Sequence, residues 1–257
     1  MANETVLLTG ASSGIGYELA KIFAEHNYNL ILVARNKEKL EEMKTELGQS
    51  TIKIMTIAKD LSLPESPQEL YTEIKERGSS VDILINNAGF GMSGNFIELD
   101  LDKQLTMMQL NMFSLTKLTH LFVQDMVKNH YGRIMNVGSI ASFFSVPKMS
   151  VYGASKAFVL SFSESLNTEL KQQGDIKVTA LCPGPTKTNF AKAAKVAEIE
   201  QFNSIGLSAK DVALSGYRAM LKGEPVVVPG FKFRAAIHSM RFLPRKLVQT
   251  LIGKTNK

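Results

Sequence analysis

Short apolar runs alternate with stretches of helical periodicity along most of this chain. The run TVLLTG at 5–10 is followed by an amphipathic stretch at 14–27 and then by the run NLILVAR at 29–35. Runs that are apolar throughout, instead of at every second residue, indicate strands that are covered on both faces. Strands that are separated by helices pair in parallel through right-handed crossovers. The pattern therefore predicts an α/β fold with a doubly wound parallel sheet and helices on both faces.

The same alternation continues to residue 230 and places the other elements. Five further strands, which bring the total to about seven, are predicted at 52–61, 81–89, 132–139, 176–184 and 225–230. Further helices are predicted at 36–47, 66–77, 102–128, 151–173 and 208–222. Because no repeat or linker interrupts this order, we expect a single domain over 1–230, with a weakly patterned substrate lid at about 185–207. Ser208 and Asp211 are predicted to cap the helix that follows the lid.

The composition excludes several classes of protein. The 257 residues are 44% apolar and 21% charged, which is enough apolar material for a core. A single cysteine, Cys182, cannot form an internal disulfide, so we expect a cytoplasmic protein. Residues 1–10 lack the regions of a signal peptide, and no apolar run is long enough to span a membrane. No metal is predicted, because the four histidines show no ligand spacing: His26, His120, His130 and His238.

The net charge of +6 is concentrated at the C-terminus. Residues 231–257 contain seven Lys or Arg and no Asp or Glu, which leaves 23 basic and 24 acidic residues before them. A nearly neutral body argues against a nucleic-acid groove. The basic amphipathic extension at 231–257 is divided by Pro244, and two roles stay open for it. It can make peripheral contact with an anionic membrane, or it can pack over the substrate opening or against a neighbouring subunit.

A glycine-rich loop, TGASSGIG, follows the first predicted strand. Gly10, Gly14 and Gly16 permit a tight turn and a close approach of the backbone to a ligand. The helix that begins here directs its free N–H groups and the positive end of its dipole at that ligand. A pyrophosphate group fits this description. The candidate contacts in the loop are Gly10, Ser12, Ser13, Gly14, Ile15 and Gly16.

The second predicted strand ends in LVAR, where sites that prefer NAD commonly carry an acidic residue. Here Ala34 is followed by Arg35. A carboxylate would repel a 2′-phosphate, whereas a guanidinium group binds it through charge-assisted hydrogen bonds. We therefore predict NADP (NADPH) as the cofactor. The alternative is that Arg35 is a solvated residue at the start of a charged helix.

The ends of the later strands offer further candidate cofactor contacts. Asp60 and Leu61 are placed to bind and cover an adenine ring, although an aspartate there is equally consistent with a turn. Small residues in NNAG let the chain pass close to the cofactor. Hydroxyl groups in CPGPTKT can hold a carboxamide or cap the next segment. These candidates are Asp60, Leu61, Asn87, Ala88, Gly89, Pro183, Gly184, Thr186 and Thr188.

Tyr152 and Lys156 are four residues apart on a predicted helix, so their side chains lie on one face. A Tyr–Lys pair at this spacing is often only a solvated surface. Ser139, however, lies at the end of the fifth predicted strand, and the intervening loop can bring its hydroxyl group to Tyr152. A nearby ammonium favours the phenolate form, so Lys156 is expected to lower the pKa of Tyr152. Tyr152 is therefore a candidate acid and base for hydride transfer to a carbonyl.

In this order and spacing, TGASSGIG, NNAG, Ser139, YGASK and PGPTKT resemble the short-chain dehydrogenase/reductase (SDR) family of the single-domain type, over about 4–230. The resemblance implies a Rossmann-type sheet. It also implies that Lys156 reaches the nicotinamide ribose and that Asn111 holds a water in a proton relay. The implied catalytic tetrad is Asn111, Ser139, Tyr152 and Lys156, of which Tyr152 and Lys156 also contact the cofactor.

The resemblance further implies a homodimer or homotetramer built on the helices at 102–128 and 151–173. We expect an oxidoreductase that transfers a hydride between NADP(H) and a secondary alcohol/ketone pair. The apolar residues of the lid and of the stretch 141–150 favour an apolar or acyl carbonyl substrate. The alternative is a non-catalytic regulator that binds NADP. An extended sugar-nucleotide epimerase is disfavoured, because the lid leaves no room for a further domain.

Overall fold

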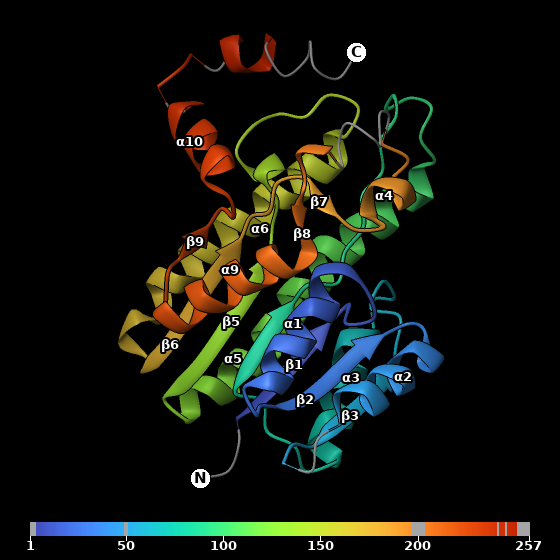
Figure 1. The fold of residues 1–257 in the computed structure, drawn as a ribbon, viewed down its shortest axis with the longest axis vertical. Coiled ribbons are helices and arrows are strands. Elements are labelled where there is room, and N and C mark those ends of the chain that lie inside the picture. Colours follow the sequence, from blue (N-terminus) through green and yellow to red (C-terminus); the bar gives the residue numbers. More distant parts are fainter. Residues whose placement is uncertain (1–3, 49–50, 197–203, 241, 245, 251–257) are drawn as a thin grey trace.

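The computed structural model describes residues 4–48, 51–196, 204–240, 242–244 and 246–250. Its main feature is a parallel sheet of seven strands in the order β3-β2-β1-β4-β5-β6-β9 (Figure 1). The strands are β1 (Thr5–Thr9), β2 (Asn29–Ala34), β3 (Ile54–Ala58), β4 (Ile83–Asn86), β5 (Tyr131–Val137), β6 (Asp175–Leu181) and β9 (Val226–Val227). The predicted doubly wound α/β fold and its strands are therefore confirmed. The order reverses between β1 and β4, so the carboxyl ends of these strands border a crevice.

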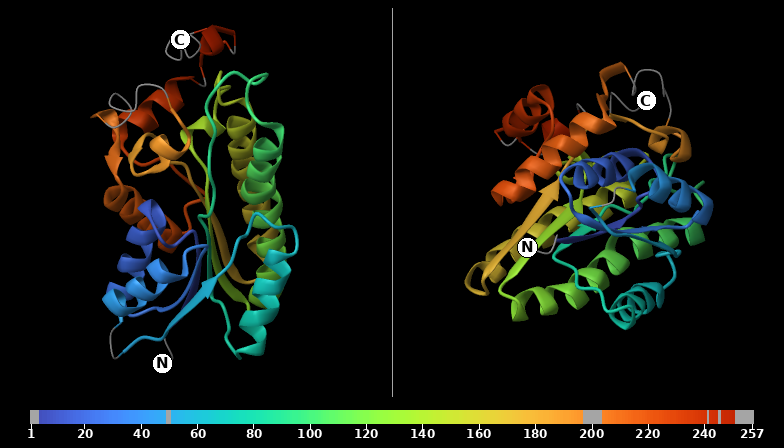
Figure 2. Two further views of the ribbon diagram at one scale, coloured as in Figure 1. Left: turned by 90° about the vertical axis from the view of Figure 1, so that its right-hand side faces the viewer. Right: turned by 60° about the horizontal axis from the view of Figure 1, so that its bottom comes forward.

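Helices cover both faces of the sheet (Figure 2). On one face lie α1 (Gly14–Glu25), α2 (Lys37–Leu47) and α9 (Ala209–Lys222), which share one apolar core with the strands. On the other face lie α3 (Ser66–Glu76), α5 (Leu115–Lys128) and α6 (Ser150–Glu169). Neighbouring residues of one strand serve opposite faces, since Leu7 belongs to the second core whereas Val6 and Leu8 belong to the first. This two-sided burial explains why the strands are apolar throughout.

Two predicted helices are interrupted in the structure. The stretch predicted as one helix at 102–128 consists of α4 (Leu101–Met108), a π-helical segment, η1 (Gln109–Ser114), and α5. Wider turns of this kind occur often at functional sites. The helix predicted at 151–173 is α6 followed by a 3₁₀ turn, η3 (Leu170–Gln172). A further 3₁₀ turn, η2 (Ile140–Ser142), follows β5.

The predicted lid contains short elements that the sequence pattern does not indicate. They are β7 (Thr186–Lys187), α7 (Phe190–Ala193) and β8 (Leu207–Ser208), with β7 and β8 paired in parallel. Residues 197–203 of the predicted lid lie outside the described part of the chain. The predicted cap of α9 is confirmed, because the Ser208 side chain accepts a hydrogen bond of 3.0 Å from the Asp211 N–H.

The C-terminal extension begins with α10 (Phe231–Met240), and residues 246–250 are helical beyond Pro244. Pro244 therefore divides two helical segments, as predicted. Among the described residues, no helix combines the length and apolar character that crossing a bilayer requires.

Candidate active site

The loop between β1 and α1 is packed tightly against the end of β4. Gly10 and Gly14 have φ angles of +65° and +56°, a region that side chains disfavour. A Cβ atom on Gly16 would lie 2.3 Å from the Gly10 carbonyl oxygen and 2.5 Å from Nδ2 of Asn87. Only glycine fits where two backbones pass this closely.

A network of hydrogen bonds fixes the end of β4 on the end of β1. The Asn87 side chain donates from Nδ2 to the carbonyl oxygens of Thr9 and Gly10, both at 3.0 Å. The Thr9 hydroxyl accepts from the backbone N–H groups of Asn87 and Ala88, both at 3.1 Å, and donates to Ile85 O at 3.2 Å. Sequence reasoning missed Thr9, whose only signal is a hydroxyl residue at a buried strand end directly before the glycine loop.

The N-terminus of α1 has the features of an anion site. Its N-cap residue, Ser13, makes no side-chain hydrogen bond to the first turn, and that turn holds no acidic residue. The N-caps of α2, α4 and α9, by contrast, are satisfied by Asn36, Asp100 and Ser208. The first N–H groups of α1 and the positive end of its dipole are thus available beside a glycine cradle. These residues fit the pyrophosphate of a dinucleotide.

The candidates after β2 and β3 occupy different environments. Arg35 is exposed directly after β2. Asp60 is half-buried, and its Oδ1 accepts hydrogen bonds from the Ser62 N–H at 2.9 Å and the Ser62 hydroxyl at 2.7 Å. The turn predicted as an alternative for Asp60 is thus present. Leu61 is buried in the apolar core on the side of α3 and α5.

The loop after β6 returns to the glycine loop. Pro183 O accepts a hydrogen bond from the Ile140 N–H at 2.9 Å, and the Thr186 hydroxyl donates to Gly184 O at 2.9 Å. The methyl carbon of Thr188 lies 3.1 Å from the position of a Cβ atom on Gly14. The predicted cofactor contacts in the loop after β1 and in the loop after β6 therefore border the same crevice.

Helix α6 holds Tyr152 and Lys156 on its buried face beside the end of β5. The Ser139 side chain adjoins the Tyr152 hydroxyl closely enough for its hydrogen bonding to lower the pKa of Tyr152. Lys156 Nζ donates to the Val137 carbonyl oxygen at 2.8 Å and lies 5.8 Å from the centre of the Tyr152 ring. The structure thus brings Ser139, from the end of β5, together with Tyr152 and Lys156 of α6.

Burial dominates the acidity of this pair. It raises the pKa of Tyr152 to about 12, and the hydrogen bond with Ser139 opposes the rise. Burial also lowers the pKa of Lys156 to about 8. The structure thus differs from the expectation that Lys156 lowers the Tyr152 pKa. Loss of solvation penalises the charged form of each group, and the ammonium donates to Val137 O.

Asn111, the fourth member of the predicted tetrad, lies in the π-helical segment. Its Nδ2 donates to Phe90 O at 3.0 Å and to the Ser155 hydroxyl at 3.1 Å, and its Oδ1 accepts from the Phe90 N–H at 3.2 Å. Gly89 adjoins both Asn111 and Lys156. A Cβ atom on Gly89 would lie 2.9 Å from Asn111 Oδ1 and 3.5 Å from Lys156 Nζ.

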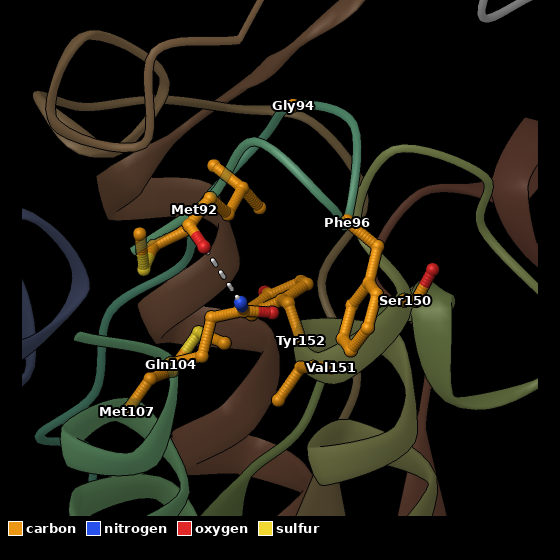
Figure 3. A pocket seen from close by; sticks show the side chains of 9 residues that line it. Met92, Gly94, Phe96, Gln104, Met107, Ser150, Val151 and Tyr152 are labelled. Atoms are coloured by element: carbon orange, nitrogen blue, oxygen red, sulfur yellow. Dashed lines mark hydrogen bonds between the residues drawn. The ribbon is translucent and has the colours of Figure 1, made fainter. Parts of the chain in front are cut away.

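A small hollow adjoins Tyr152 (Figure 3). Its lining is largely apolar and comprises Met92, Gly94, Phe96, Leu99, Gln104, Met107, Ser150, Val151 and Tyr152. The centre of the Phe190 ring, in α7, lies 5.5 Å from the centre of the Tyr152 ring. The Phe190 ring also contacts Gly91, where an added Cβ atom would lie 2.7 Å from it. Sequence reasoning missed Phe190 as a contact of Tyr152, because the contact joins segments that are far apart in the chain.

Comparison with known proteins supports this assembly. A family model described as short chain dehydrogenase matches residues 4–198. Dehydrogenase/reductase SDR family member 7B of Mus musculus is 30% identical over 268 residues, which are 100% of this chain and 83% of that protein.

Two solved structures are similar as well. A short-chain dehydrogenase from Sphingobium yanoikuyae in complex with NADPH has 31% identity and a TM-score of 0.84, and the match covers 97% of this chain and 95% of that one. A bulky-bulky ketone specific alcohol dehydrogenase from Comamonas testosteroni has 30% identity and a TM-score of 0.78, with 94% and 93% covered. The chain therefore belongs to the short-chain dehydrogenase/reductase family, whose members are oxidoreductases that bind a nicotinamide cofactor.

Proposed function

We propose that this protein is an NADP(H)-dependent oxidoreductase that reduces an apolar or acyl carbonyl compound to a secondary alcohol. The observation that carries the proposal is the adjacency of the Tyr152 and Ser139 side chains beside the glycine-lined crevice and an apolar hollow. A carbonyl oxygen bound there can accept hydrogen bonds from both hydroxyl groups.

Each residue of the tetrad has a distinct part in this proposal. The bound cofactor supplies the hydride. Tyr152 gives its proton to the carbonyl oxygen, and Ser139 stabilises the negative charge that develops there. With a pKa raised to about 12, Tyr152 is protonated at neutral pH and carries the proton that the carbonyl oxygen requires. Lys156 and Asn111 then return a proton towards Tyr152.

The preference for NADP is proposed from the residues at the end of β2. The strand ends in the buried Ala34, where an acidic residue would repel a 2′-phosphate, and the next residue is the exposed Arg35, whose guanidinium group can bind one. The bound NADPH in the Sphingobium yanoikuyae relative is consistent with this choice.

The substrate class is proposed from the hollow. Methionine, phenylalanine, leucine and valine side chains dominate its lining, and the centre of the Phe190 ring lies 5.5 Å from that of the Tyr152 ring. Such a lining favours apolar groups beside the reacting carbonyl. The ketone specificity stated for the Comamonas testosteroni relative supports this class.

A homo-oligomer is proposed from the outer surfaces of the helices that follow β4 and η2. Leu101, Leu105 and Phe113 of α4 and η1 are exposed, and the rings of Phe158 and Phe162 are stacked along α6 with centres 5.7 Å apart. Light scattering after gel filtration measures this directly. A monomeric mass at micromolar concentration would contradict it.

The decisive test of the activity is the variant Tyr152→Phe. It should abolish NADPH-dependent reduction of ketones and β-ketoacyl compounds, followed at 340 nm, and leave NADPH binding nearly unchanged. Tyr71→Phe is the matched control, because the Tyr71 hydroxyl is bound to Asp125 between α3 and α5 and takes no part in the site. Retention of most of the kcat by Tyr152→Phe would refute the mechanism. NADPH binding without turnover of any substrate by the native protein would instead favour the regulator.

The cofactor preference needs a separate variant. The KM for NADPH should rise at least tenfold in Arg35→Ala, whereas the KM for NADH should be almost unchanged. Lys37→Ala, which removes an exposed charge from the first turn of α2, serves as the control. Equal KM values for the two cofactors in the native protein would refute the assignment.

A further inference from the structure

The C-terminal extension leaves a group of large apolar side chains in solvent. The exposed fractions are 76% for Phe231, 89% for Phe242, 39% for Leu243 and 45% for Leu247. When a soluble monomer exposes two phenylalanines and two leucines within so short a segment, they generally mark an interaction site. We call these four residues, together with the exposed basic residues Lys232, Arg234 and Lys246, the C-terminal surface.

The extension is attached to the rest of the molecule by other side chains. Ile237 and Val248 are buried, at 5% and 9% exposure. The Phe233 ring lies about 3.0 Å from the position of a Cβ atom on Gly184, so it packs on the turn after β6. Because the extension already buries one set of apolar residues, the C-terminal surface is a second set that the fold does not need.

The charge of the extension identifies its partner. Seven Lys or Arg and no Asp or Glu lie within residues 231–257, against 23 basic and 24 acidic residues in the rest of the chain. Aromatic and aliphatic side chains among basic ones match an anionic lipid bilayer, in which the apolar groups enter the interface and the cations meet lipid headgroups. Two copies of this surface placed against each other would bring together only positive charges, which disfavours a symmetric contact through it.

We propose that the C-terminal surface binds the face of an anionic lipid bilayer and attaches the enzyme to it peripherally. Figure 1 shows α10 at the carboxyl end of the sheet, where the candidate active site also lies, and the contact of Phe233 with Gly184 ties it to that end. Bound in this way, the enzyme would place the rim of its crevice beside the bilayer. The inference concerns binding alone, so it does not depend on the proposed activity.

The test uses the full chain and flotation with lipid vesicles. We expect the protein to bind vesicles of phosphatidylcholine with about a third phosphatidylserine at least tenfold more strongly than vesicles of pure phosphatidylcholine, and raised salt should weaken the binding. The variant F242S/K246E, which changes two exposed side chains of the surface, should reduce binding at least tenfold.

The matched control is L221S/K222E, which makes the same kinds of change at exposed residues of α9. It should bind like the native protein, and NADPH titration and circular dichroism check that both variants are folded. Equal binding of the two variants, or no binding by the native chain, would overturn the proposal. So would a loss of oligomeric mass specific to F242S/K246E without any effect on vesicles, which would make the surface a contact between copies.

Discussion

Replacing Gly16 by alanine should disrupt the cofactor site by forcing apart two backbones that are in direct contact. The new Cβ atom would lie 2.3 Å from the Gly10 carbonyl oxygen. A carbon and a carbonyl oxygen normally approach to about 3.3 Å, so a gap of about 1 Å has to open. The displaced Gly10 carbonyl is also an acceptor for Asn87 Nδ2, which itself would lie 2.5 Å from the added methyl group.

The size of the effect follows from three contributions. Overpacking of a tight contact costs about 1–3 kcal/mol. Loss of the Asn87 hydrogen bond adds about 1 kcal/mol, and the better helix propensity of alanine returns about 1 kcal/mol. The free energy of unfolding should therefore fall by about 2 kcal/mol, which lowers the Tm of a chain of this size by about 4–8 °C.

Gly153→Ala is the matched control, since it makes the same substitution within another helix. The nearest atom to a Cβ there is 3.7 Å away, an ordinary contact. The alanine should raise the Tm by about 2 °C through helix propensity alone. Thermal unfolding followed by circular dichroism measures both variants, and fluorescence titration should give a Kd for NADPH at least tenfold higher in Gly16→Ala. Equal Tm values for the two variants would refute the packing argument.

Three other perturbations test the site. The free energy of unfolding, measured with urea, should rise by about 2 kcal/mol more between pH 7 and 9.5 in the native protein than in Lys156→Met. Burial lowers the pKa of Lys156 in the folded protein to about 8, so over this range the unfolded chain binds more protons than the folded one. The same pH dependence of the unfolding free energy in both proteins would contradict this. Phe190→Ala should raise the KM for an apolar ketone about tenfold, with the Kd for NADPH unchanged, because about 1.5 kcal/mol of apolar contact is lost; an unchanged KM would place Phe190 outside the substrate site. Gly89→Ala should lower kcat at saturating NADPH more than tenfold, since the methyl group would lie 2.9 Å from Asn111 Oδ1 and displace the amide beside Lys156; full kcat would exclude a proton route there.

The sequence predicted the elements well because their signals are local. Continuous apolar runs such as the one at 29–35 arise from burial on both faces, and the structure has β2 there. The glycine loop and the Tyr152–Lys156 spacing are local too. The acidity of Tyr152 was not predictable in the same way, because it depends on how deeply α6 and the β5 end bury the hydroxyl group.

The features that the sequence did not indicate are contacts between distant segments. Thr9 and Asn87 are 78 residues apart, and their hydrogen bonds exist only because β1 and β4 are neighbours in the sheet. Phe190 meets Tyr152 and Gly91 through the short helix α7 within a weakly patterned lid. The apolar periodicity of a single segment does not indicate a contact with a distant segment.

The hydrogen bonds of the Asn111 side chain fix its position and leave one acceptor site open. Both donor hydrogens of its amide are used, one on Phe90 O and one on the Ser155 hydroxyl, so the side chain clamps the strand end to α6. Its Oδ1 accepts from the Phe90 N–H, and a carbonyl oxygen has a second lone pair. Gly89 adjoins both Oδ1 and Lys156 Nζ, and no side chain stands on it between these two atoms. A residue that is fully committed as a donor and half committed as an acceptor can hold a fixed position and still accept a hydrogen bond from a water, which is the part in a proton relay that we propose for Asn111.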